Sequence, residues 1–142
     1  MSTAQYFQSP GPLGELYEAT GFSHAVVLPV GAQLVITSGQ PGLNRQKRAT
    51  ATAAEQIEGC FDNVDTALKA AGVTEGLWKA HKIQCFLLDV SLEPTMMEIW
   101  RRKWRGHRPT WATVGTSGLC GPGMIIELIA EAHIVPEKTT QP

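Results

Sequence analysis

Residues 50–71, TATAAEQIEGCFDNVDTALKAA, contain the clearest structural pattern in the chain. The large apolar side chains of this segment recur at spacings of four, three and four residues, which places them on one face of a helix. They are Ile57, Phe61, Val64 and Leu68. The glycine that follows is a natural helix stop, because glycine readily adopts left-handed backbone angles. The pattern predicts a helix with one apolar stripe, which must pack on a sheet or on another helix.

A second helix is predicted at 93–105, with Ser91 as a reasonable N-cap. Its residues at helical spacing are Met96, Ile99, Trp100 and Lys103. The last turns are strongly basic, which suits the negative end of a helix dipole. One apolar strand separates this helix from the first, so the two helices can lie side by side on the same sheet.

Runs of β-branched and apolar residues around these helices predict strands. The predicted strands span 24–28, 34–38, 78–90, 110–116 and 124–130, and the last continues toward Val135. The first two are expected to form an antiparallel hairpin, followed by a loop at 40–44. The order β-β-α-β-α-β-β predicts an α/β protein of the α+β type, with two helices on one face of a mixed sheet. The opposite face would stay uncovered in a monomer, which predicts oligomerisation.

Length and composition favour one domain spanning 1–142, with a core at about 22–135 and flexible ends that include a Pro/Gly-rich lead-in at 9–14. The 12 basic and 13 acidic residues give a net charge of −1, so no bulk positive charge attracts nucleic acid. Three cysteines without CxxC spacing favour a reducing compartment over a disulfide framework or a zinc site. With no signal-peptide pattern and no apolar stretch long enough to cross a bilayer, we expect a cytoplasmic protein without membrane partners.

Several segments together resemble the RidA/YjgF family, which is also called the L-PSP endoribonuclease family. They are 36–40 (ITSGQ), 61–72 (FDNVDTALKAAG), 86–90 (FLLDV), Pro109 and the pair at 126–127. The similarity covers roughly 25–132 in the same order along the chain. It implies a chorismate-mutase-like fold and a homotrimer, with small-molecule clefts between the subunits. A trimer would also cover the sheet face that the pattern of elements leaves bare.

Family members of the RidA type hydrolyse enamines and imines without a cofactor, and they yield a 2-keto acid and ammonia. The resemblance implies that Glu127, in the last strand, is the acid/base group. It also implies a carboxylate-binding arginine two residues after Pro109, where this chain has Trp111. A tryptophan has a single N–H donor and cannot make the bidentate contact. We therefore expect a substrate other than a standard 2-imino acid, unless Arg108 replaces the missing cation.

Three further residues are candidates for contact with the substrate. Ser38 and Gln40 match the family segment at the rim of the cleft, although turn formation alone could explain that segment. Thr113 shares the facing of Trp111 on its strand. Trp111 itself could either form a stacking wall for a flat ligand or pack in a subunit interface. Glu127 could likewise serve only as a structural hydrogen-bonding group across that interface.

Cys120 lies in a glycine-rich loop and is also a candidate for the cleft. It would be a nucleophile only beside a base such as His107 or His133, and otherwise it is an inert thiol. His24 and His81 lack partners at metal-binding spacing, and no HExxH, GxGxxG or P-loop motif occurs. We therefore expect neither a metal nor a cofactor.

The sequence thus predicts an enzyme that acts on a small unsaturated, imine or enamine metabolite, with Glu127 as the proton shuttle. Its reaction would be hydrolysis of the enamine/imine deaminase kind, or the isomerisation or cyclisation of a specialised pathway. Two alternatives stay open, a retained imine deaminase that uses Arg108 and a non-catalytic small-molecule-binding trimer. A third, RNA binding by the basic segment 101–105, is disfavoured by the near-neutral net charge.

Overall fold

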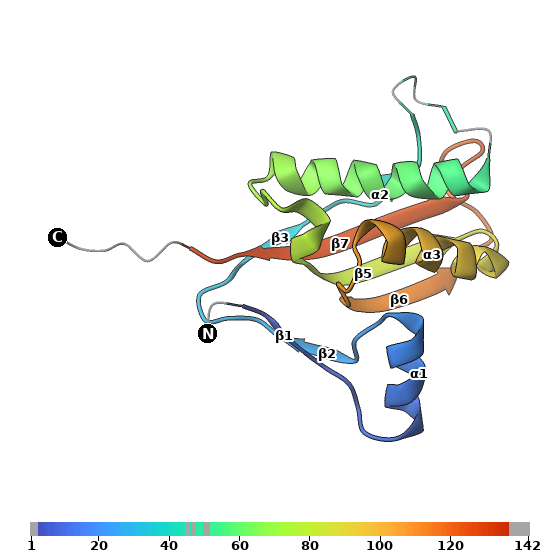
Figure 1. Ribbon diagram of the computed structural model, residues 1–142. Helices are drawn as coiled ribbons and strands as arrows, with labels where there is room; N and C mark the ends of the chain where they lie inside the picture. Colours follow the sequence, from blue (N-terminus) through green and yellow to red (C-terminus); the bar gives the residue numbers. More distant parts are fainter. Residues whose placement is uncertain (1–2, 45, 47, 50–51, 137–142) are drawn as a thin grey trace.

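Two helices, α2 (Ala53–Ala70) and α3 (Glu93–Lys103), cover one face of a mixed sheet in the computed structural model (Figure 1). The structure describes residues 3–44, 46, 48–49 and 52–136. The main strands are β3 (Gln33–Ile36), β5 (Ala80–Leu87), β6 (Thr110–Gly115) and β7 (Ile126–Ile134), with a two-residue strand β4 (Gln40–Pro41). Their order across the sheet is β3-β7-β5-β6, and β4 also pairs with β7. β5 and β6 are parallel, whereas β7 is antiparallel to its neighbours. The expected α+β architecture is confirmed.

The N-terminal part departs from the sequence-based prediction. Strand β1 (Gln5–Phe7) and helix α1 (Pro12–Thr20) occupy the region that we expected to be an irregular lead-in. β1 pairs with β2 (Ala25–Val27) in a separate ribbon beside the main sheet. The predicted hairpin between 24–28 and 34–38 is therefore wrong, because β3 pairs with β7 instead. Alternation within a short strand predicts which residues share a face, but it does not identify the partner strand.

Smaller corrections concern the ends of elements. Residues 40–41 form β4 within the segment expected to be a loop. A 3₁₀ turn (Val90–Leu92) precedes α3, and Ser91 is not the N-cap of this helix. Instead, the backbone N–H of Ser91 donates to the Asp89 carboxylate at 2.9 Å. α3 ends at Lys103 rather than 105, and the predicted start of α2 at 50–51 lies outside the described residues, as does the C-terminal end at 137–142.

The apolar stripe of α2 is the centre of the core, as its spacing predicts. All four of its predicted residues have no exposed surface, and neither has Trp100 of α3. The sheet presents alternate residues to the helices; on β7 these are Ile126, Leu128, Ala130 and Ala132, all fully buried. None of the helices in the described part of the chain is long and apolar enough to cross a lipid bilayer.

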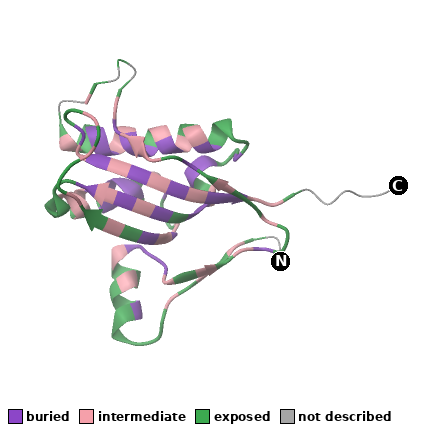
Figure 2. Ribbon diagram, turned by 180° about the vertical axis from the view of Figure 1, so that it is seen from behind, coloured by how far each residue is buried: buried purple, intermediate pink, exposed green. Residues whose placement is uncertain are grey.

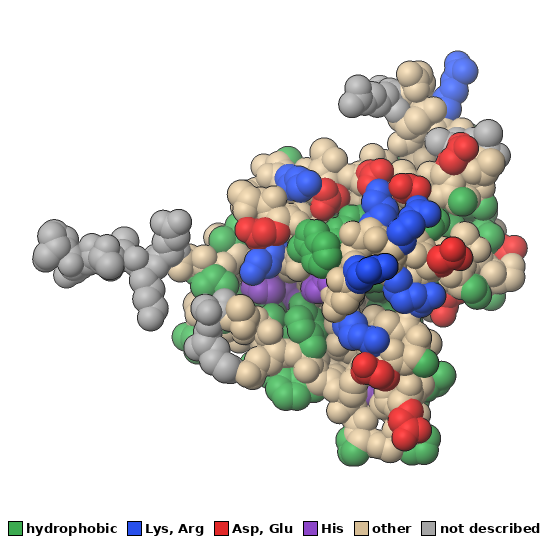
Figure 3. Space-filling view, in the orientation of Figure 1, with side chains coloured by type: hydrophobic (Ala, Val, Ile, Leu, Met, Phe, Trp, Pro, Cys, Tyr) green, Lys and Arg blue, Asp and Glu red, His purple; other side chains and the backbone are tan. Residues whose placement is uncertain are grey.

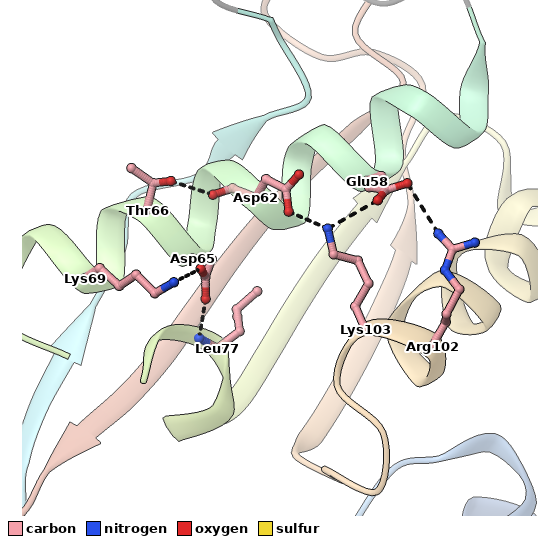
Figure 4. A network of polar contacts seen from close by, with 8 residues as sticks. All are labelled: Glu58, Asp62, Asp65, Thr66, Lys69, Leu77, Arg102 and Lys103. Atoms are coloured by element: carbon pink, nitrogen blue, oxygen red, sulfur yellow. Dashed lines mark hydrogen bonds and ion pairs between the residues drawn. The ribbon is translucent and has the colours of Figure 1, made fainter. Parts of the chain in front are cut away.

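Ion pairs connect the two helices at the surface (Figure 4). The Lys103 ammonium lies 2.6 Å from Asp62 and 3.3 Å from Glu58 of α2. Arg102 also contacts Glu58, at 3.3 Å. Exposed pairs of this kind contribute about 0–1 kcal/mol each. They orient the basic end of α3, and they show that two of its cations are paired with α2 rather than simply solvated.

The other face of the sheet is bare, as predicted, because no described helix or loop covers it (Figure 2). Large apolar side chains stand exposed there, with 52% of the surface of Leu34, 61% of Ile36 and 43% of Val114 accessible. Their registers pair them with His133, Glu131 and Phe86, which share this face. The face therefore mixes apolar side chains with carboxylates.

Gln56 attaches the start of β7 to α2. Its side chain is buried, and its amide oxygen accepts a hydrogen bond from the Ile125 N–H at 2.6 Å. Its amide nitrogen donates to the carbonyl of Gly123 at 3.1 Å. These two bonds fix the chain immediately before the strand that carries Glu127.

Replacing Gln56 by methionine keeps the side-chain volume but removes both hydrogen bonds. We expect Gln56→Met to lower the free energy of unfolding by about 1–3 kcal/mol, because the Ile125 N–H loses its partner in a partly buried site. Urea unfolding with an unchanged slope is the measurement. The exposed neighbour Glu55 provides the control, and Glu55→Met should change stability by about 0.5 kcal/mol or less. Equal effects of the two variants would contradict this role of Gln56.

Candidate functional site

Glu127 lies on the bare face of the sheet, near the start of β7. It pairs with Phe86 of β5 on one side and with Pro41 of β4 on the other. Its carboxylate rests directly against the backbone of Gly39, where an added Cβ would lie 2.7 Å from Glu127 Cδ and 2.9 Å from Oε2. The glycine at this position therefore makes room for the carboxylate.

No hydrogen bond or ion pair joins the Glu127 carboxylate to another described residue, although it is half-buried. Nearby, the Cys60 thiol donates to the carbonyl of Gln40 at 3.1 Å. Burial raises the pKa of this thiol well above its ordinary value, and Cys85 and the charge of Glu127 add to the effect. Cys60 thus stays neutral. A half-buried carboxylate with no cation beside it is completed by water or by a ligand.

Ser38 and Gln40 flank Gly39, so both predicted residues adjoin the backbone that packs against the Glu127 carboxylate. Ser38 is exposed and Gln40 is half-buried. The Gln40 amide donates a long hydrogen bond, 3.4 Å, to the carbonyl of Ser38. In the register of β4 and β7, Gln40 pairs with Leu128, which faces the helices, so the Gln40 side chain is directed away from the face of Glu127. The exposed Ser38 stays a candidate for contact with a ligand there. The sequence analysis did not predict the role of Gly39. This glycine lies in the segment that turn formation alone could explain, and the structure shows that it makes room for the Glu127 carboxylate.

Trp111 is placed differently from both sequence-based interpretations, a cleft wall or interface packing. Its indole is 8% exposed and lies in the core of its own chain. The ring stacks on Phe22 with centroids 5.4 Å apart, and it meets Trp100 edge-to-face at 5.1 Å. Its N–H donates to Thr113 at 3.1 Å. Because β6 pairs Trp111 with the buried Ile83, this side chain points toward the helices and away from the face of Glu127.

Arg108 does not reach Glu127 within one chain. Its guanidinium donates to the carbonyl of Glu18 at 2.8 Å and lies 3.5 Å from the Glu18 carboxylate. Arg108 lies just before the start of β6, where Thr110 pairs with Lys82 of β5. Glu127 pairs with Phe86, which is four residues or about 13 Å further along β5. Within one chain Arg108 therefore does not supply the missing cation to Glu127, and its contribution to a cleft between subunits stays a prediction.

Cys120 is exposed in the loop that leads into β7. The bases considered for it lie at the other end of the sheet. His133 is near the end of β7, and His107 contacts the carbonyl of Ala80 at 2.6 Å. Neither activates Cys120 within one chain. Among the described residues, no three His, Cys, Asp or Glu side chains are arranged to hold a metal ion.

The structure also pairs two histidines that the sequence did not connect. His81 and His133 are both buried, and their Nδ1 atoms lie 3.0 Å apart. Burial is the main reason that the pKa of each lies below its ordinary value. A bulge between Ala80 and Lys82 places His81 in this position. Because 52 residues separate the two histidines, no local pattern could predict the contact.

The family described as Endoribonuclease L-PSP matches residues 14–134. No curated protein matches the chain. The fold is similar to YyfB from Yersinia pestis, a Rid-family protein of unknown function, with 18% identity and a TM-score of 0.77 over 94% of this chain and 100% of that one. Rv2704 from Mycobacterium tuberculosis, of the YjgF/YER057c/UK114 family, shows 23% identity and a TM-score of 0.63 over 93% and 100%. TdcF from E. coli, in a structure with bound serine, shows 22% identity and a TM-score of 0.66 over 92% of this chain and 94% of that one.

A methyl group at Gly39 should displace the candidate acid/base group without disrupting the fold. We expect Gly39→Ala to move the Glu127 carboxylate by about 1 Å, because carbon atoms cannot approach much closer than 3.5 Å. The stability should change by about 1 kcal/mol or less, since a flexible side chain can yield. A crystal structure and a thermal melt of the variant measure both effects.

Gly118 provides the matched control, because an added Cβ there meets no atom within 4 Å. Gly118→Ala should leave Glu127 in place. An unmoved Glu127 in Gly39→Ala would show that the backbone, rather than the carboxylate, absorbs the methyl group.

Proposed function

The chain belongs to the Endoribonuclease L-PSP (RidA/YjgF) family, and we propose that it is an enzyme acting on a small imine, enamine or other unsaturated metabolite. Glu127 is the acid/base group, and the working form is a homotrimer with its clefts between the subunits. The observation that carries the proposal is the half-buried Glu127 carboxylate, which lies against Gly39 with no cation paired to it among the described residues.

The simplest reaction is hydrolysis of a C=N bond. The Glu127 carboxylate takes a proton from water while the water oxygen attacks the imine carbon. The same carboxyl group then returns the proton to nitrogen, which gives a neutral carbinolamine. In the second stage Glu127 takes the proton of the carbinolamine hydroxyl and delivers it to nitrogen, so that the C–N bond breaks and ammonia leaves as the carbonyl forms. An enamine enters this sequence after protonation at carbon. One carboxylate that is not neutralised by a salt bridge can take up and deliver the proton in both stages.

The substrate class follows from the missing cation. Trp111 occupies the position of the family arginine and points into the core, and Arg108 is engaged with Glu18. Nothing in one chain places a guanidinium fork beside Glu127, so a substrate without a carboxylate is favoured over a standard 2-imino acid. The structure of TdcF with bound serine supports a small polar ligand at this fold, but that ligand carries a carboxylate.

Exposed apolar residues support the trimer. Leu34 and Ile36 of β3 and Val114 of β6 stand on the bare sheet face together with Glu127. Burying such a face against other copies is favourable, because apolar area leaves water. It would also enclose Glu127 between subunits, where a ligand is shielded from solvent.

Glu127→Gln should reduce hydrolysis of a small imine by about 10²–10⁴-fold, because the amide can neither take nor return the proton. The assay follows ammonia release from a neutral cyclic or aryl imine, and from 2-aminoacrylate generated in place. Glu131→Gln is the control, since Glu131 lies on the same strand and face but contacts His81 at 3.7 Å. The control should keep its activity.

Three outcomes separate the alternatives. Turnover of the neutral imine alone supports the proposed substrate class, whereas turnover of 2-aminoacrylate requires a cation from another subunit. A native chain that binds these ligands but turns none of them over would be a binding protein rather than an enzyme.

A charge on the bare sheet face should dissociate the trimer. We expect Ile36→Lys to convert the protein largely to monomers, because a lysine in the interface must lose its hydration. Sedimentation velocity measures the change, and thermal melts check that the monomer still folds. Leu13→Lys, at a 56% exposed position on α1, is the control and should leave the assembly intact. A monomeric native chain would disprove the trimer.

A further inference from the structure

A second candidate site lies on the helix side of the molecule, away from Glu127. The end of α3 and the segment that follows it line a hollow of about 390 Å³, which is within the range of small-molecule sites. Its charged lining residues are Arg101, Arg102, Arg105, Arg108 and Glu98. Figure 3 shows Lys and Arg side chains gathered on this face. The lining thus holds four guanidinium groups and one carboxylate in a chain whose net charge is −1. Two of the arginines, Arg102 and Arg108, also pair with carboxylates outside the lining, those of Glu58 and Glu18.

The partners of these arginines leave much of their hydrogen-bonding capacity unused. Arg105 has no hydrogen bond or ion pair with any described residue, and Arg101 donates only to the carbonyl of Thr20, at 3.2 Å. Arg102 shares Glu58 with Lys103. A guanidinium carries five N–H donors, so most donors around the hollow are free to bind an anion.

Two of the arginines are held in position by α1. The carbonyls of Glu18 and Thr20, in its last turn, accept from Arg108 and Arg101 respectively. These contacts use the unpaired carbonyls at the end of a helix, which favour cations. They fix the stems of the two side chains and leave the charge of Arg101 without a carboxylate. The N-terminal segment thereby pre-positions half of the hollow's guanidinium groups.

We propose that this hollow binds the phosphate or pyrophosphate group of a small molecule. Planar guanidinium forks match phosphate oxygens in pairs, and several of them around one concave site favour a multiply charged oxyanion. A compact hollow favours a small ligand over a nucleic acid, which needs a basic surface that follows its backbone. The site is independent of the proposed reaction at Glu127.

The test is titration of the full chain with sodium pyrophosphate, followed by calorimetry at an ionic strength of about 0.15 M. We expect a Kd below about 1 mM. Arg105→Gln should weaken binding by about tenfold, and the double variant Arg101→Gln/Arg105→Gln should weaken it further, because each removes a charge-assisted contact. Arg105 has no partner among the described residues, so its replacement should leave the fold intact.

Two control variants make the result specific. Arg48→Gln removes an exposed cation outside the hollow and should bind pyrophosphate like the native chain. Glu127→Gln should do the same, so the outcome does not depend on the proposed reaction. Absent or millimolar-range binding, or equal losses in Arg48→Gln and Arg105→Gln, would overturn the proposal. The proposal would also be overturned, in favour of nucleic acid, by a single-stranded RNA that binds at least tenfold more tightly than pyrophosphate and loses its binding in the Arg101 and Arg105 variants.

Discussion

The alternation of side chains along β7 is the constraint on which both the core and the candidate site depend. Ile126, Leu128 and Ala130 point toward the helices and are fully buried, whereas Glu127 between them points to the bare face. A shift of register by one residue would exchange the two sets and place the carboxylate under α2. The two hydrogen bonds of Gln56 fix the chain just before this strand. Packing on one face thereby determines the position of the proposed acid/base group on the other.

The aromatic core and the half-buried Glu127 carboxylate lie on opposite faces of the sheet. An aromatic cluster of Phe22, Phe61, Trp100 and Trp111 fills the helix side. An arginine at position 111 with the same facing would have to bury its charge within this cluster, which is costly without a partner. The tryptophan is therefore a core residue, and the carboxylate on the opposite face is left without the cation that a carboxylate substrate would need.

Four arginines gather instead around the end of α3, where α1 holds two of them in position. The irregular-looking N-terminal segment is thus part of the structure in two ways. It builds a ribbon with β2 beside the sheet, and its helix supplies carbonyl acceptors to Arg101 and Arg108. The proposed anion site and the proposed acid/base group thus lie on different sides of the single chain.

The sequence by itself determined the apolar stripe of α2 and the order of α2, α3 and the main strands. It also determined that both helices lie on one face of the sheet, and it identified the family. Each of these depends on local periodicity or on matched segments. The sequence also proposed Glu127, Ser38 and Gln40 as site residues, and the fold places Gly39, which lies between the last two, against the Glu127 carboxylate. Only the tertiary structure decided the partner of β2, the inward facing of Trp111 and the capture of Arg108 by Glu18. A strand pattern defines two faces without saying which one meets the core, and a long side chain takes whichever acceptor the folded chain places nearby. Both outcomes depend on contacts between residues far apart in sequence, which no local pattern records.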